Sequence, residues 1–224
     1  VELAYARALI ADSVPVFGLV RSRIGYILLD QRGMDQLLRC LSGPETGETV
    51  ETQQQRCWRH ARKSAIGRVP PFLLQAMLRR KLPTGFAYLN VGHSNLTDRV
   101  LGAMRSVDAR IAVFIHDVIP LDFPEFQRDG TVRPFEEMIA RVAKHANLVI
   151  YNSNDTQARA QAYFPQNPAS IVSHLGTDRV DPVAADVPET VPQNAPFFVC
   201  IGTIEPRKNH TFLLDLWDVM GAKA

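Results

Sequence analysis

Two adjacent cations, Arg207 and Lys208, lie in the stretch IGTIEPRKNH, between an apolar run and a helical pattern of apolar residues. This order predicts a strand, a turn and the start of a helix, in which Gly202 permits a tight backbone and Asn209 caps the helix. Cations beside the positive end of a helix dipole are unfavourable unless an anion joins them. A bound diphosphate would satisfy this turn; the alternative is a solvated charged turn.

Polar side chains also follow apolar runs of strand length, FAYLNV, ARIAVFI, NLVIY and ASIVSHL. Continuous apolarity indicates strands buried on both faces, as in a parallel sheet, and such sheets bind ligands at the carboxyl ends of their strands. The candidate ligand-binding residues at that edge are His93, Ser94, Asn95, His116, Asp117, Asn152 and Ser153. For Asn95, Asn152 and Ser153 the alternative is a helix cap, and for His116 it is a satisfied core histidine.

The order of the elements that carry these residues predicts a doubly wound α/β fold. Helical patterns alternate with the four apolar runs, at residues 97–107, 134–146 and 156–163. This alternation is typical of parallel strands joined by crossover helices. We also expect short strands in VPVFGLV and GYILLD, and a helical stretch over 53–81 that breaks at Pro70 and Pro71.

Composition changes near residue 179 and divides the chain. Residues 1–178 carry the parallel-sheet pattern, the Pro-rich segment 179–195 predicts a linker, and 196–224 hold one strand and one helix of a second domain. One strand and one helix cannot bury their own faces. We therefore expect a fragment of a longer protein, whose N-terminal domain lacks its first strand and whose second domain is truncated.

Composition and motifs also restrict the class of protein. The 224 residues are 46% hydrophobic and 21% charged with a net charge of +2, so neither a nucleic-acid partner nor a membrane span is expected. Cys40, Cys57 and Cys200 are odd in number and lack C-x-x-C spacing, which argues against a disulfide framework or zinc site and favours a cytoplasmic setting. The motifs of P-loop enzymes, zincins and metal-bridged sugar transferases are missing, so we expect no metal and no cofactor.

The stretch 56–81 is strongly basic. It holds eight Lys or Arg residues and no acid, interleaved with apolar residues such as Trp58 and Phe72. Basic amphipathic helices bind anionic lipid surfaces, which predicts peripheral association with the inner face of the membrane. The alternative is a solvated basic helix over the domain core.

GTIEPRKNH resembles the sequence that opens the C-terminal domain of family 4 (group 1) glycosyltransferases, the retaining nucleotide-sugar enzymes of the GT-B type. HDVIPLDFPEF, LVIYNSNDT, SHLGTD and VELAYARAL are similar to segments that recur in the same order in bacterial members. The resemblance covers most of the chain. It implies two Rossmann-like domains facing across a cleft, with the acceptor on the N-terminal domain and the sugar nucleotide mainly on the C-terminal one.

Residue by residue, the resemblance implies that Arg207 and Lys208 bind the donor diphosphate, that His116 lies near the transferred sugar, and that Glu205 is structural. Thr203 replaces an Arg found in many members. The implied reaction is retaining transfer of a sugar such as mannose from a nucleoside-diphosphate sugar to a glycan or lipid-linked acceptor in bacterial polysaccharide synthesis. The alternatives are a GT-B epimerase and a non-catalytic sugar- or nucleotide-binding module. We expect the 224-residue chain alone to be inactive, because other parts of the site are expected to lie outside it.

Overall fold

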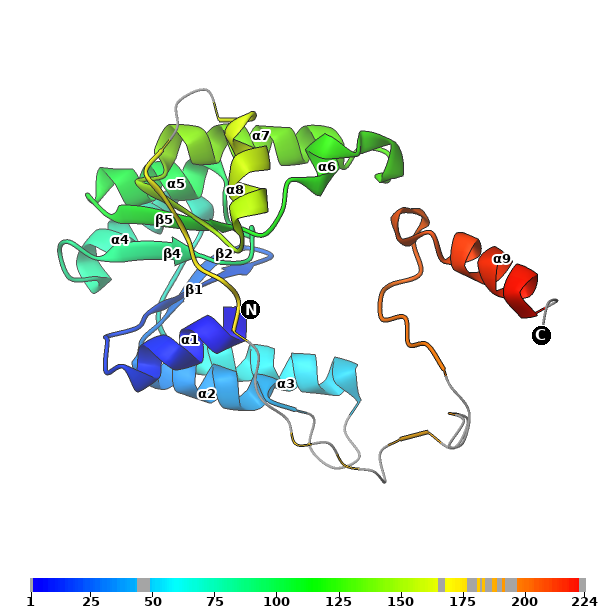
Figure 1. The fold of residues 1–224 in the computed structure, drawn as a ribbon. Helices are drawn as coiled ribbons and strands as arrows, with labels where there is room; N and C mark the ends of the chain where they lie inside the picture. Colours follow the sequence, from blue (N-terminus) through cyan, green and yellow to red (C-terminus); the bar gives the residue numbers. More distant parts are fainter. Residues whose placement is uncertain are drawn as a thin grey trace.

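A computed structural model describes residues 2–43, 49–164, 168–176 and 197–221, and the single residues 181, 183, 187, 188 and 191. The predicted α/β class is confirmed: a parallel four-stranded sheet is flanked by helices, as in a Rossmann-like domain (Figure 1). A smaller antiparallel sheet, which the sequence did not predict as a separate unit, lies beside it.

The parallel sheet has the strand order β4-β5-β6-β7. Its strands are β4 (Ala87–Asn90), β5 (Arg110–Ile115), β6 (Leu148–Tyr151) and β7 (Ser170–Val172). The crossover helices are α5 (Asp98–Ser106), α7 (Val132–His145) and α8 (Asn154–Gln161), where the sequence predicted them. Thr97 and Ser153 begin α5 and α8, since each side chain accepts a hydrogen bond from a backbone N–H in the first turn. All four strands therefore present their carboxyl ends at one edge.

The antiparallel sheet has the order β1-β2-β3, with β1 (Gly18–Ser22), β2 (Gly25–Leu29) and β3 (Ala65–Val69). A helix pair, α2 (Gln31–Leu41) and α3 (Val50–Lys63), covers one face of it (Figure 1). Every residue of β2 is buried. Because successive side chains of a strand point to opposite faces, Ile27 and Leu29 pack toward the helix pair, and Tyr26 and Leu28 join the main core.

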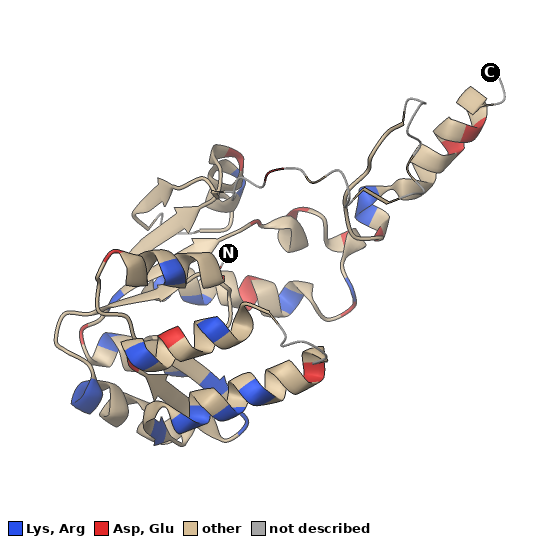
Figure 2. Ribbon diagram, turned by 90° about the horizontal axis from the view of Figure 1, so that it is seen from below, with Lys and Arg blue, Asp and Glu red and all other residues tan. Residues whose placement is uncertain are grey.

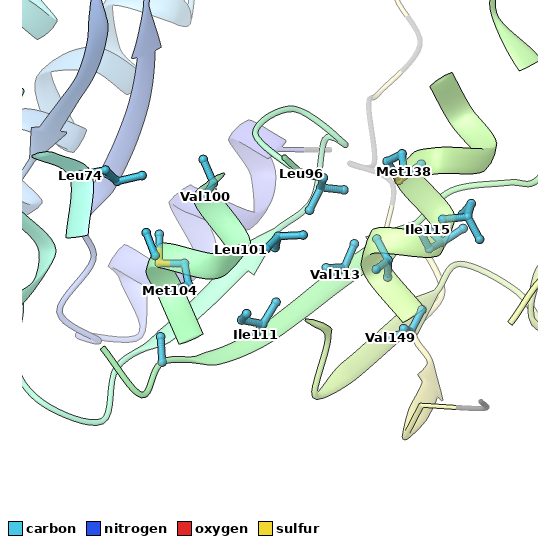
Figure 3. Close-up of a cluster of buried hydrophobic side chains, with 14 of the residues drawn as sticks. Leu74, Leu96, Val100, Leu101, Met104, Ile111, Val113, Ile115, Met138 and Val149 are labelled. Carbon is cyan, nitrogen blue, oxygen red and sulfur yellow. The ribbon is translucent and has the colours of Figure 1, made fainter. Parts of the chain in front are cut away.

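The main core lies between the parallel sheet and its helices (Figure 3). Its fully buried members include Val100 and Leu101 from α5 and Ile111 and Val113 from β5. Two further helices of this part of the chain are α4 (Leu74–Lys81), which adds Leu74, Met77 and Leu78 to the core, and the short α6 (Ile119–Asp122). The core thus fixes the positions of the strand ends.

The helical stretch predicted over 53–81 with a break at Pro70 and Pro71 is wrong, and this changes the basic stretch 56–81 within it. It comprises the end of α3, the strand β3, the 3-10 turn η1 (Pro71–Leu73) and α4. Strand β3 was missed because AIGRV is short and its burial comes from pairing with β2, a contact remote in sequence. Of the apolar residues in this stretch, Phe72 is 79% exposed, whereas Trp58 packs against the helix-pair core.

The expectation of no disulfide is wrong. Cys40 and Cys57 are bonded, with Cα atoms 5.5 Å apart, and the bond joins α2 to α3. Cysteine spacing along the chain does not reveal that two antiparallel helices bring the residues together, because each lies inside a helix. Cys200 is a free, exposed thiol.

Residues 197–221 lie apart from these layers (Figure 1). They form the 3-10 turn η4 (Pro206–Lys208) and the helix α9 (His210–Gly221). The strand expected at 197–201 is wrong: these residues have no regular structure, and in the described part of the chain no strand pairs with them. A strand requires a hydrogen-bonding neighbour, so an apolar run alone does not make one. Most of residues 179–195 lie outside the described residues, so the linker there stays a prediction.

Candidate active site

Two imidazoles meet at the carboxyl edge of the parallel sheet. His93 lies in the loop after β4 and His116 directly follows β5, and their ring centroids are 5.3 Å apart. The Nε2 of His93 is 3.0 Å from the carbonyl oxygen of Phe114, and the Nε2 of His116 is 2.6 Å from that of Val91. Each imidazole is thus hydrogen-bonded to a backbone carbonyl two residues before the other histidine.

These contacts fix the proton on each ring. A carbonyl oxygen can only accept a hydrogen bond, so the Nε2 of His93 and of His116 must be the donor. In the neutral imidazole the other nitrogen, Nδ1, is then an acceptor. The pair therefore offers two acceptor nitrogens, a chemistry suited to hydroxyl groups.

His93 is held neutral by its surroundings. Burial lowers its pKa, and the neighbouring His116 lowers it further because two imidazolium ions would repel each other. The bond to the Phe114 carbonyl and the carboxylates of Asp117 and Glu2 oppose this shift but do not reverse it. A neutral ring keeps its acceptor nitrogen at physiological pH.

Hydrogen bonds from Asn90 hold the loop that carries His93 in place. Asn90, buried at the end of β4, donates from Nδ2 to the Tyr88 hydroxyl at 3.0 Å and to the carbonyl oxygen of Ser94. Both His93 and Asn95 have left-handed backbone angles, with φ of 59° and 62°. Asn95 is not a helix cap, because Thr97 caps α5; its amide donates to the Leu19 carbonyl at 3.5 Å. Ser94 is exposed at the tip of the loop.

The first helix, α1 (Glu2–Ala11), reaches the same site, which the sequence did not predict. The ring of Tyr5 meets that of Phe114 edge-on, with centroids 5.7 Å apart. A Cβ atom added to Gly92 would meet the carboxylate of Glu2, so this side chain reaches the loop that carries His93. No local pattern in the sequence places residues 2 and 5 against a loop ninety positions away.

The side chains after β5 and β6 make local hydrogen bonds. Asp117 Oδ1 accepts a hydrogen bond from the backbone N–H of Ile119 at 3.1 Å. Asn152 Oδ1 accepts from the Thr156 hydroxyl at 2.8 Å, and Ser153 is the N-cap of α8. The capping alternative is therefore correct for Ser153, and the side chains of Asp117 and Asn152 also serve local turns.

The turn with the two cations differs from its prediction in three respects. Arg207 already has an anion, since its guanidinium is 2.7 Å from Glu205 Oε1. Gly202 has no left-handed backbone, and an added Cβ would meet only the Lys208 stem at an ordinary 3.9 Å. Asn209 has φ 49° and closes η4, whereas an N-cap residue is extended. Among the described residues, the Lys208 side chain has no ion pair and no side-chain hydrogen bond.

No group of three or more His, Cys, Asp or Glu side chains able to hold a metal occurs among the described residues. Within the same residues, no helix has the length and apolarity required to cross a bilayer.

No family model matches the chain. It is similar to proteins of Escherichia coli named Serotype-specific mannosyltransferase WbdA, at 32% identity over 141 residues. The match covers 52% of this chain but only 16% or 17% of those relatives, so the chain spans a small part of their length.

Proposed function

We propose that the chain is part of a retaining glycosyltransferase of family 4 with the GT-B fold, which transfers mannose or a similar sugar from a nucleoside-diphosphate sugar. The acceptor is a glycan or a lipid-linked glycan of a bacterial polysaccharide. The similarity to proteins named mannosyltransferase supports the reaction class. The observation that carries the proposal is the imidazole pair at the carboxyl edge, His93 and His116.

In this proposal the pair binds sugar hydroxyls. The two Nδ1 atoms accept hydrogen bonds from hydroxyl groups, because both Nε2 atoms are occupied by carbonyl oxygens. His116 faces the transferred sugar and His93 the acceptor. Since each ring is already fixed to the backbone, no side-chain rotation has to be frozen on binding, which favours catalysis.

The transfer breaks the bond between the anomeric carbon and the diphosphate oxygen, and the electron pair leaves with the diphosphate. The acceptor oxygen forms the new bond on the same face of the sugar, and its proton passes to the departing diphosphate. Lys208 stabilises the charge that develops on this leaving group. Glu205 orients Arg207 in the turn, so that Arg207 contributes a planar guanidinium whose remaining N–H groups face the anion.

The experiment is a product assay with the full-length enzyme. GDP-mannose and other nucleotide sugars are supplied with a glycan acceptor, and the anomeric configuration of the product is read by NMR. Transfer with retention is expected. Conversion of the nucleotide sugar without an acceptor would indicate an epimerase, and binding without turnover a binding module; either result would refute the proposal.

We also propose that the protein docks on an anionic membrane surface through residues 56–81; the Cys40–Cys57 bond removes the cysteine argument for a cytoplasmic setting, so this proposal rests on the basic stretch alone. This stretch exposes both cations, such as Arg79 and Arg80, and the apolar ring of Phe72, and this combination suits an anionic interface. Co-sedimentation with vesicles containing phosphatidylglycerol should fall with salt and with Phe72→Ser. Binding that depends on neither anionic lipid nor salt would end this proposal.

A further inference from the structure

A polar hollow lies between α2 and α3, away from the parallel sheet. Its volume is about 700 Å³, within the range of small-molecule sites. Arg39 of α2 and Arg56, His60 and Lys63 of α3 line it. Figure 2, which views the molecule from this side, shows Lys and Arg side by side with few acids along these helices.

Cations from both helices line this hollow. Its described lining contains no Asp or Glu. Among the described residues, the side chains of Arg39 and Lys63 form no ion pair and no hydrogen bond, and both are exposed. Like charges that face one hollow repel each other, and an anion between them removes this repulsion.

Neutral donors complete the lining. The Ser64 hydroxyl donates to Gln36 Oε1, which occupies the oxygen of that amide and leaves its N–H groups for another partner. The disulfide between Cys40, which also lines the hollow, and Cys57 holds the two helix walls together. Cations with amide N–H donors on a fixed frame suit a tetrahedral oxyanion.

We propose that this hollow is a phosphate-binding site, distinct from the turn at Lys208 and from the imidazole pair. The phosphate belongs either to a soluble phosphorylated molecule or to the headgroup of an anionic lipid. The inference does not depend on glycosyl transfer, because the hollow contains none of the residues assigned to that reaction.

The test titrates inorganic phosphate into the 224-residue chain at constant ionic strength and follows binding by the shift in melting temperature. The double variant Arg39→Gln/Lys63→Gln should weaken phosphate binding at least tenfold, since it removes two charge-assisted contacts. The matched control Arg99→Gln/Arg128→Gln removes two exposed cations outside the hollow and should stay within twofold. If the double variant does not fold, Lys63→Glu alone should also weaken binding at least tenfold.

A second arm separates the two sources of phosphate. Vesicles of phosphatidylglycerol are compared with vesicles of phosphatidylcholine. Binding of free phosphate that is lost in Arg39→Gln/Lys63→Gln indicates a soluble ligand. Binding only to phosphatidylglycerol, lost in that variant but kept in the control, indicates a headgroup. If neither probe distinguishes the double variant from its control, the proposal is wrong.

Discussion

Replacing His116 by glutamine should separate its anchoring of the loop from its binding of a sugar. The amide Nε2 of glutamine can replace the imidazole Nε2 that donates to the Val91 carbonyl at 2.6 Å. Glutamine has no ring nitrogen in the place of Nδ1. We therefore expect His116→Gln to keep the hydrogen bond, to lose only the ring contact with Phe114, worth about 0.5–1.5 kcal/mol, and to lose about a hundredfold in turnover.

The matched variant His116→Ala loses both functions. It removes one hydrogen bond, worth about 1 kcal/mol net, and the contact with the Phe114 ring, whose centroid is 4.8 Å away and which adds about 0.5–1.5 kcal/mol. Urea unfolding of the 224-residue chain should show a total loss of about 1.5–2.5 kcal/mol. Turnover is measured in the full-length enzyme. Wild-type turnover in His116→Gln would mean that Nδ1 is not used, and a loss of more than about 4 kcal/mol in His116→Ala would identify a core histidine.

Three further predictions concern other groups. Because burial lowers the pKa of His93, the unfolded chain binds that proton more tightly, so the free energy of unfolding should fall as pH drops below about 6.5. Urea titrations at several pH values should show a smaller dependence on pH in His93→Gln. An unchanged dependence would refute the lowered pKa of His93. Reduction of the Cys40–Cys57 bond, which spans 17 residues, should cost about 3 kcal/mol of unfolding free energy and leave a Cys40→Ser/Cys57→Ser variant unaffected; three titratable thiols without reductant would contradict the bond. In the full-length enzyme, Lys208→Ala should weaken nucleoside-diphosphate binding and lower turnover about a hundredfold, and Lys208→Arg should recover only part of the binding and turnover. If Lys208→Ala behaves like the wild type, the turn is a solvated charged turn and does not bind the diphosphate.

The sequence predicted the parallel sheet well because its signals are local. The runs that became β4 to β7 are mostly apolar, as strands buried on both faces require, although β7 at the edge leaves Ile171 48% exposed. Polar caps such as Thr97 and Ser153 mark the helices between them. The same reasoning placed His93 and His116 at one edge. It did not give their mutual contact or the protonated nitrogen, which depend on carbonyl groups of the neighbouring loop and strand.

The misses share a physical cause, which is contact between segments remote in sequence. Strand β3 exists because it pairs with β2, and the Cys40–Cys57 bond exists because α2 packs on α3. Glu2 reaches the site only through the packing of α1. The turn before α9 is the exception, because Arg207 pairs there with Glu205, only two residues away.

The burial of strand β2 determines how cooperatively the part of the chain up to β7 unfolds. Its side chains alternate between two cores and none is exposed, so neither core can open without disrupting the other. The helix pair and the parallel sheet should therefore unfold in a single cooperative transition. The amide protons of β2 should exchange with solvent only through this global opening, more slowly than those of α9, whose side chains are almost all exposed.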